Sequence, residues 1–293
     1  MSYTTTVDTE GTQRWFKNSV LHRDGDQPAE IWANGTRFWF KNGLSHRDGD
    51  QPAEIWASGS AFWYKDGNLH RDGDQPAEVY TTGNKGWYKY GLKHRDGDQP
   101  AEIWADGSMF WYKNGKQHRD GDQPAEIRAD GTMLWCKDGK LHRVSESDEP
   151  AVIQADGGKC WCKDGKLHRD GDQPAEIWAD GTKFWYRDGL KHRDGDEPAV
   201  IRPDKHKCWY KDGKLHRVIE SDEPAIIWAD GTMFWFKDDN LHRDNDQPAA
   251  IYANGTKYWY KDGDLHRDGD KPAVMHADGR AEWWVDGVKQ PDK

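Results

Sequence analysis

The chain has 293 residues, of which 34% are hydrophobic and 32% are charged, and its formal net charge is −10. This acidic balance opposes nucleic-acid binding and provides no basic face for an anionic membrane. The shortage of aliphatic residues would suit a disordered chain, but 18 Trp, 11 Tyr and 8 Phe recur at fixed spacing. The composition therefore predicts a folded chain with a thin, aromatic core.

The first ten residues do not follow the pattern of the rest and are expected to form an N-terminal tail. They lack the charged and then apolar layout of a signal peptide, and no apolar run in the sequence is long enough to span a membrane. We therefore expect an intracellular protein without strong membrane interaction.

From about Gly11 onward the sequence repeats itself. A His-Arg dipeptide recurs every 24 residues from His22 to His266, a Trp precedes each of these His residues by seven positions, and Pro-Ala follows. Two intervals are 26 residues long because two residues are inserted between Arg143 and Pro150 and between Arg217 and Pro224. The flanking pattern resumes unchanged, so the inserted segment is predicted to be a surface loop.

Within one repeat, Asp180-Gly181 and Asp188-Gly189 are typical of tight hairpin turns. They predict strands over 175–179 and 183–187, with 190–193 leading into a loop. The fold class expected is all-β: an elongated tandem array of about twelve 24-residue antiparallel hairpins in a single sheet or β-solenoid. Residues 11–289 form one repeat domain, followed by a C-terminal tail at 290–293.

A two-residue turn would pair Ile31 with Phe38 and Ala29 with Phe40, and so place these residues on one buried face. The position of Ile31 is aliphatic or Met in every copy, which supports its burial. The position of Phe38 is taken by Arg14 in the first copy and by Glu282 in the last. Polar residues at these two ends are expected of capping repeats.

The repeat resembles the MORN repeat and its variants. The shared features are an aromatic strand, a turn such as Asn114-Gly115-Lys116, a second strand and a closing Asp-Gly turn. The resemblance implies a sheet of successive hairpins and a scaffold function. The His-Arg and Pro-Ala elements depart from the MORN pattern, and similar repeats occur in bacterial, phage and large-virus proteins.

Three residue types could carry chemistry. The His column could bind metal, but it supplies one His per repeat beside an Arg, so stacking or hydrogen bonding is the preferred interpretation. Asp-Gly-Asp loops such as Asp24-Gly25-Asp26 could bind calcium, but each offers two carboxylates, and a turn paired to Arg is preferred. The four Cys occupy columns otherwise filled by aromatic residues and are predicted to be small buried hydrophobic residues. No catalytic residue, metal or cofactor is predicted.

Two Trp columns remain. The invariant one, from Trp15 to Trp283, is expected to be covered by the Arg of its own repeat, although an exposed ladder is the alternative. The other column accepts Trp, Arg and Gln, so it is predicted to face solvent and to bind partners. Its candidate partner-binding residues are Trp32, Trp56, Trp104, Arg128, Trp178, Arg202 and Trp228.

The function predicted is that of a non-enzymatic repeat scaffold that binds a protein partner or its own copies. Repetition itself opposes catalysis, because an active site is a single constellation of different groups. Two alternatives stay open: an aromatic-clamp solenoid that binds choline, a glycan or another small ligand, and a structural component of a virus or phage particle.

Overall fold

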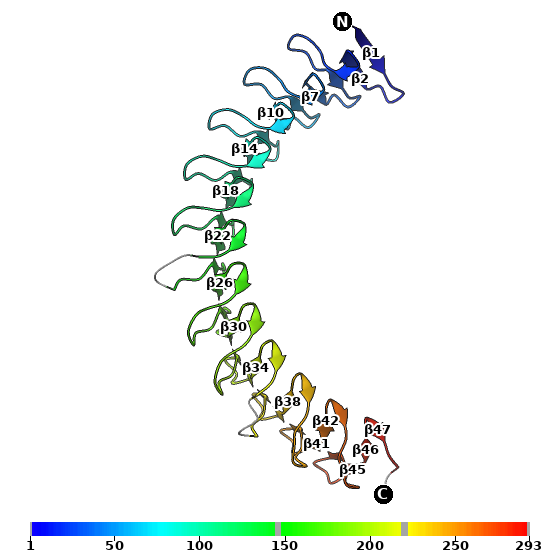
Figure 1. Cartoon of the computed structure of the whole chain (residues 1–293), viewed down its shortest axis with the longest axis vertical. Coiled ribbons are helices and arrows are strands. Elements are labelled where there is room, and N and C mark those ends of the chain that lie inside the picture. The colour runs from blue at the N-terminus through cyan, green and yellow to red at the C-terminus, as the bar shows by residue number, and fades with distance from the viewer. Residues whose placement is uncertain (1, 144–147, 218–221, 292–293) are drawn as a thin grey trace. The chain divides into compact units, whose positions relative to one another are not determined.

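The computed structural model describes residues 2–143, 148–217 and 222–291. They contain no helix, and the chain is all-β, built from repeated antiparallel hairpins (Figure 1). The chain divides into two compact units, Met1–Glu146 and Ser147–Lys293. The extra residues of the two 26-residue intervals fall within 144–147 and 218–221, so the loop predicted there lies outside the described residues.

Each repeat contributes four short strands. The first carries the residue equivalent to Ile31: β4 Glu30–Ile31, β8 Glu54–Ile55, β12 Glu78–Val79, β16 Glu102–Ile103, β20 Glu126–Ile127, β24 Val152–Ile153, β28 Glu176–Ile177, β32 Val200–Ile201, β36 Ile226–Ile227, β40 Ala250–Ile251 and β44 Val274–Met275. The second carries the residue equivalent to Phe38: β5 Arg37–Phe38, β9 Ala61–Phe62, β13 Lys85–Gly86, β17 Met109–Phe110, β21 Met133–Leu134, β25 Lys159–Cys160, β29 Lys183–Phe184, β33 Lys207–Cys208, β37 Met233–Phe234, β41 Lys257–Tyr258 and β45 Ala281–Glu282.

The third and fourth strands form a small separate hairpin in each repeat. The third strands are β6 Phe40–Lys41, β10 Tyr64–Lys65, β14 Tyr88–Lys89, β18 Tyr112–Lys113, β22 Cys136–Lys137, β26 Cys162–Lys163, β30 Tyr186–Arg187, β34 Tyr210–Lys211, β38 Phe236–Lys237, β42 Tyr260–Lys261 and β46 Trp284–Val285. The fourth strands are β7 Leu44–Ser45, β11 Asn68–Leu69, β15 Leu92–Lys93, β19 Lys116–Gln117, β23 Lys140–Leu141, β27 Lys166–Leu167, β31 Leu190–Lys191, β35 Lys214–Leu215, β39 Asn240–Leu241, β43 Asp264–Leu265 and β47 Val288–Lys289.

First and second strands alternate in one antiparallel sheet within each unit. In unit 1, for example, β4 pairs with β5, β5 with β8 and β8 with β9. The N-terminal edge is formed by β1 (Tyr3–Val7), which pairs with β2 (Gln13–Lys17), while β3 (Val20–Leu21) completes the first small hairpin. Part of the segment expected to be a tail is therefore a strand, and it covers the first repeat.

The two turn signals of each repeat adopt different geometries. At the second signal, Asn42 and Gly43 have φ of 52° and 81°, and Lys41 pairs with Leu44, so the predicted two-residue turn is confirmed. At the first signal the loop has three residues instead. Trp32 N–H bonds to Thr36 O at 2.9 Å, Gly35 N–H bonds to Trp32 O at 2.9 Å, and Gly35 has a φ of 90°. This is a type I turn followed by a glycine bulge.

The extra loop residue corrects the predicted register. Ile31 pairs with Arg37, and Glu30 pairs with Phe38, so the predicted pairing of Ile31 with Phe38 is wrong by one residue. Since a shift of one residue moves a side chain to the other face, Phe38 lies on the face of Glu30, opposite Ile31. The residue equivalent to Ile31 is half-buried or exposed in every repeat, so the expectation that it is buried is also wrong.

The core of each repeat is built mainly by the Ala of its Pro-Ala pair and by its invariant Trp. The Ala of each Pro-Ala pair is at most 1% exposed from Ala29 to Ala273. The invariant Trp is 6–8% exposed in most repeats and half-buried at Trp15, Trp63 and Trp283. The backbone of this Trp joins successive repeats: Trp185 N–H, for example, bonds to Ala199 O of the next repeat at 2.8 Å, and its own O accepts from His192 N–H. This junction interrupts the strand predicted over 183–187, which forms β29 and β30.

Candidate functional site

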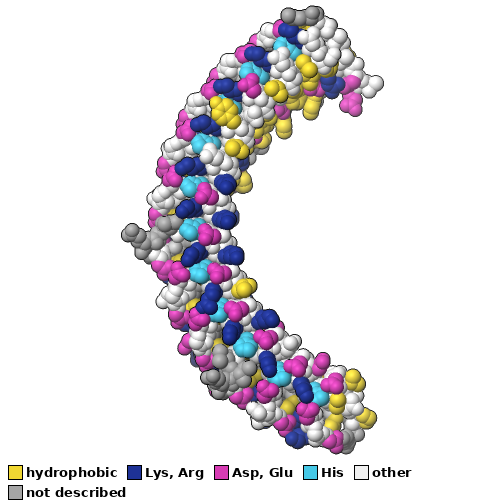
Figure 2. Space-filling model, viewed as in Figure 1, with side chains coloured by type: hydrophobic (Ala, Val, Ile, Leu, Met, Phe, Trp, Pro, Cys, Tyr) yellow, Lys and Arg dark blue, Asp and Glu magenta, His cyan; other side chains and the backbone are white. Residues whose placement is uncertain are grey.

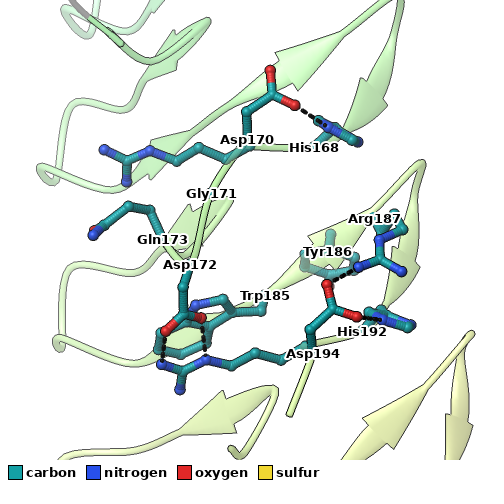
Figure 3. Close-up of a pocket in the computed structure, with 12 residues that line it drawn as sticks. His168, Asp170, Gly171, Asp172, Gln173, Trp185, Tyr186, Arg187, His192 and Asp194 are labelled. Carbon is teal, nitrogen blue, oxygen red and sulfur yellow. Dashed lines mark hydrogen bonds and ion pairs between the residues drawn. The ribbon is translucent and has the colours of Figure 1, made fainter.

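The loops that contain His-Arg line a series of similar pockets, one between each of several successive repeats. The pocket between the loops of His168 and His192 has a volume of about 290 Å³, and three others in unit 1 measure about 270 to 350 Å³. Figure 3 shows the first, in which Asp170 faces His168 and Asp194 lies between Arg187 and His192. Within each unit, Figure 2 shows the same cationic, acidic and His side chains recurring along the visible face.

The Arg of each loop covers the invariant Trp. The Arg193 guanidinium carbon lies 4.0 Å from the centroid of the Trp185 ring. The same guanidinium binds both carboxylate oxygens of Asp172, at 2.6 and 2.8 Å, and donates to Pro198 O at 3.1 Å. The Arg contact to the Trp of its own repeat recurs from Arg23 to Arg267, which confirms that this Trp column is covered.

Asp172 belongs to the loop before that of Arg193, so the ion pair links one repeat to the next. The sequence interpretation paired each Arg within its own loop, and the structure corrects this. The Arg193 guanidinium lowers the pKa of Asp172 by hydrogen bonding to the charged carboxylate. Because Asp172 is largely exposed, we assign the ion pair itself at most about 1 kcal/mol. The stacked indole and the Pro198 carbonyl give the guanidinium its fixed position.

The His of each loop links its repeat to the following one. His192 Nδ1 accepts a hydrogen bond from the backbone N–H of Asp212 at 3.1 Å, and its Nε2 lies 3.0 Å from Asp194 Oδ1. With its proton on Nε2, the neutral ring accepts from the Asp212 amide and donates to Asp194. Nδ1 also lies 2.9 Å from Asp212 Oδ1. The hydrogen bond lowers the pKa of Asp194. Both ring nitrogens are thus engaged in a structural link.

The partners of the His, Asp and Cys side chains bear on the metal binding and the thiol chemistry considered for this sequence. Among the described residues, no group of three or more His, Cys, Asp or Glu is arranged to hold a metal ion. The two carboxylates of an Asp-Gly-Asp loop point to different partners, one to His and one to Arg, as Asp170 and Asp172 do. The four Cys are free thiols, and burial raises the pKa of Cys160 to about 12 and of Cys162 to about 11, which leaves both poor nucleophiles at neutral pH.

The second Trp column remains open to solvent. We call it the Trp32 column: Trp32, Trp56, Tyr80, Trp104, Arg128, Gln154, Trp178, Arg202, Trp228, Tyr252 and His276. Its five Trp are 43–49% exposed, and Arg128 and Arg202 are exposed as well. All seven residues predicted to bind partners therefore lie on the surface, and they recur along one face of the sheet in each unit.

Carboxylates that the sequence analysis did not single out lie beneath this column. The Trp32 indole N–H donates to Glu30 at 3.1 Å, that of Trp104 to Glu102 at 2.9 Å, and that of Trp178 to Glu176 at 2.8 Å. Glu54, Glu78 and Glu176 also form hydrogen bonds with Tyr rings of the small hairpins. Burial, together with Glu54, raises the pKa of Tyr64 to about 12. The signal available in the sequence was a Glu two residues before the Trp32 column, which recurs in each of the five repeats from Glu30 to Glu126.

Aromatic rings of the second strands lie between members of the Trp32 column. The Phe62 ring centroid lies 5.0 Å from that of Trp56 and 5.3 Å from that of Tyr80. In unit 2, Phe234 lies 5.4 Å from Trp228 and 5.7 Å from Tyr252 in the same way. Tilted and edge-on contacts of this kind stabilise the rings against one another, so the exposed indoles have defined orientations.

The described part of the chain contains no helix with the length and apolar character needed to cross a membrane. In comparisons with known proteins, no protein-family model matches this chain, and no curated protein matches it at a significant level.

Proposed function

We propose that this chain is a non-enzymatic repeat scaffold of MORN-like type that binds protein partners, or its own copies, through the Trp32 column. The observation that carries the proposal is the contrast between the two Trp columns. The invariant indoles are covered by Arg, whereas the five indoles of the Trp32 column stay 43–49% exposed.

Ordered, exposed aromatic side chains favour binding. The indoles of Trp32, Trp104 and Trp178 are each held by a carboxylate, so little rotamer freedom is left to lose on association. Trp, Tyr and Arg make up most of the column, and these residue types are also enriched where interfaces gain most of their binding energy. Recurrence of the column allows several modest contacts to act together on one partner.

A triple variant tests the proposal. Replacing Trp32, Trp56 and Trp104 together by Ser is expected to leave the melting temperature of the full chain within a few degrees of the parent. It is expected to weaken capture of the partners that co-purify with the native protein, or the self-association measured by sedimentation. A folded triple variant that retains both interactions would contradict the proposal. Loss of a glycan or choline ligand, in place of a protein, would favour the aromatic-clamp alternative.

A further inference from the structure

In unit 1 the row of second-strand rings is interrupted at Gly86, and Leu134 takes the last position of the row. Gly86 occupies the second-strand position that Phe38, Phe62 and Phe110 occupy elsewhere, and it pairs with Glu78 on one side and Glu102 on the other. The Phe62 ring lies between Trp56 and Tyr80, whereas Gly86 contributes no ring of its own between Tyr80 and Trp104.

A carboxylate takes part of that space. A Cβ at Gly86 would lie 2.8 Å from Glu78 Oε2 and 2.9 Å from Tyr88 Cε2, so these side chains lean over the glycine. Glu78 bonds to the Tyr88 hydroxyl, and burial raises the pKa of Glu78. The repeat therefore carries a partly buried acidic group between two members of the Trp32 column.

The neighbouring carboxylates differ in their partners. Glu30, Glu102 and Glu126 each bond to a basic side chain, namely Arg14, Lys93 and Arg128. Within the described residues, no Lys or Arg forms an ion pair with Glu54 or Glu78, whose hydrogen bonds come from Trp56, Tyr64 and Tyr88. In unit 1 the carboxylates of this face that form no ion pair thus lie in two adjacent repeats, beneath Trp56 and Tyr80, with Lys93 acting on Glu78 only through its electrostatic field.

The spacing of the column restricts the form of a partner. Two strands per repeat at about 4.8 Å each place successive members of the column about 9.6 Å apart. A polyproline II helix rises about 3.1 Å per residue with three residues per turn, which gives about 9.3 Å per turn. A segment in this conformation that crosses the strands therefore presents every third residue to successive members, with a mismatch of only about 1 Å over three repeats.

We propose that the Trp56–Tyr80–Trp104 stretch binds a proline-rich, basic segment of a protein partner in the polyproline II conformation. An Arg or Lys of that segment packs on the outer surface of the Tyr80 and Trp104 rings, beside the Glu78 carboxylate that covers Gly86. Cations bind aromatic faces, and their attraction increases when a carboxylate lies within the same site. The inference rests on the proposed function of the Trp32 column and assigns its partner chemistry in unit 1.

The test uses a labelled synthetic peptide of four Arg-Pro-Pro triplets and the full chain, with binding followed by fluorescence anisotropy. Two comparison peptides replace Arg by Glu, or replace both Pro residues by Gly and Ser. We expect the Glu peptide to bind at least about tenfold more weakly because its charge is opposed, and the flexible Arg peptide several-fold more weakly because it must be ordered.

Variants locate the site. Gly86→Phe displaces the Glu78 and Tyr88 side chains that cover the glycine, and Glu78→Gln removes the charge. Each is expected to weaken binding of the Arg-Pro-Pro peptide about tenfold. Lys85→Gln, on the opposite face of the same strand, is the control and is expected to change affinity less than twofold. If Gly86→Phe does not fold, the Glu78→Gln variant decides. Equal binding of the Arg and Glu peptides, or unchanged binding by folded Glu78→Gln, overturns the inference.

The triple Trp→Ser variant separates this inference from the proposed function. If that variant loses the native partner while the Arg-Pro-Pro peptide never binds the parent, the column binds a partner of other chemistry, and only the inference fails. If the variant keeps the native partner and also binds the peptide like the parent, both fail.

Discussion

The contact between Arg95 and Trp87 offers the sharpest test of how one repeat is held to the next. Arg95 lies 4.0 Å from the Trp87 ring, binds both oxygens of Asp74 at 2.5 and 2.8 Å, and donates to Pro100 O at 3.1 Å. We consider its replacement by Ala and by Lys. Lys keeps the charge but cannot form the two-pronged contact or stack as a plane.

The expected loss follows from these contacts. Asp74 is 63% exposed, so the ion pair contributes at most about 1 kcal/mol. Stacking of the guanidinium on the indole adds about 1 kcal/mol, and the Pro100 carbonyl left without its donor costs about 1 kcal/mol. Arg95→Ala should therefore destabilise its repeat by about 3 kcal/mol, and Arg95→Lys by about half as much.

Hydrogen exchange measured by mass spectrometry reports the stability of individual repeats. This is needed because each repeat contacts only its neighbours and can open locally. The amides of Trp87 and Ala101 bond to Ala101 O and Phe110 O, and their exchange should accelerate by about two orders of magnitude in Arg95→Ala. The amide of Ala225 in unit 2 should not change. Arg37→Ala, which removes an exposed Arg from the sheet face, is the matched control. Protection at Trp87 and Ala101 within about 0.5 kcal/mol of the parent would refute the reasoning.

Three further outcomes are expected. Trp111→Ser replaces an indole that is only 6% exposed and should lower the free energy of unfolding by about 3–5 kcal/mol. Trp104→Ser should change thermal melting little, and the reverse result in paired melting curves would mean that the two columns are wrongly assigned. Arg95 lowers the pKa of Asp74 in the folded chain below its value in the unfolded chain. The stabilisation from such ion pairs should therefore be fully present above about pH 5 and be lost as the pH falls through the pKa of the folded state. Urea midpoints at pH 6 and pH 3 should show this fall, and Asp74→Asn should make it smaller. EDTA should leave the melting temperature unchanged, and a drop of several degrees reversed by zinc or calcium would contradict this.

The repeat organisation and the surface columns could be predicted because the chain contains many copies of one unit. Comparing copies showed that position 32 accepts both Trp and Arg, which only a solvent-facing position tolerates, and the structure exposes both residue types there. The same comparison predicted that Arg covers the invariant Trp. The Asn42-Gly43 turn was also predictable, because both residues tolerate positive φ.

The register could not be predicted because Asn-Gly and Asp-Gly suit two different loops. A two-residue turn and a three-residue loop with a glycine bulge both need Gly at positive φ, and they differ by one residue in pairing. Gly35 forms the longer loop, so Ile31 and Phe38 lie on opposite faces. The link from Arg193 to Asp172 was missed for another reason: it joins residues 21 positions apart, in different repeats.

That link explains where this chain accepts additional sequence. Arg143 binds Asp122, and Asp148 binds Arg169. Likewise, Arg217 binds Asp196, and Asp222 binds Arg243. These ion pairs form although each 26-residue interval has its extra residues between such an Arg and the next Asp. The Arg and the Asp on either side are anchored to different repeats, so the segment between them can lengthen without moving either anchor. Loop closure costs only about 0.6 kcal/mol per doubling of length. Each loop is therefore a ready insertion point, where a peptide epitope or a small domain could be grafted at the spacing of the repeats.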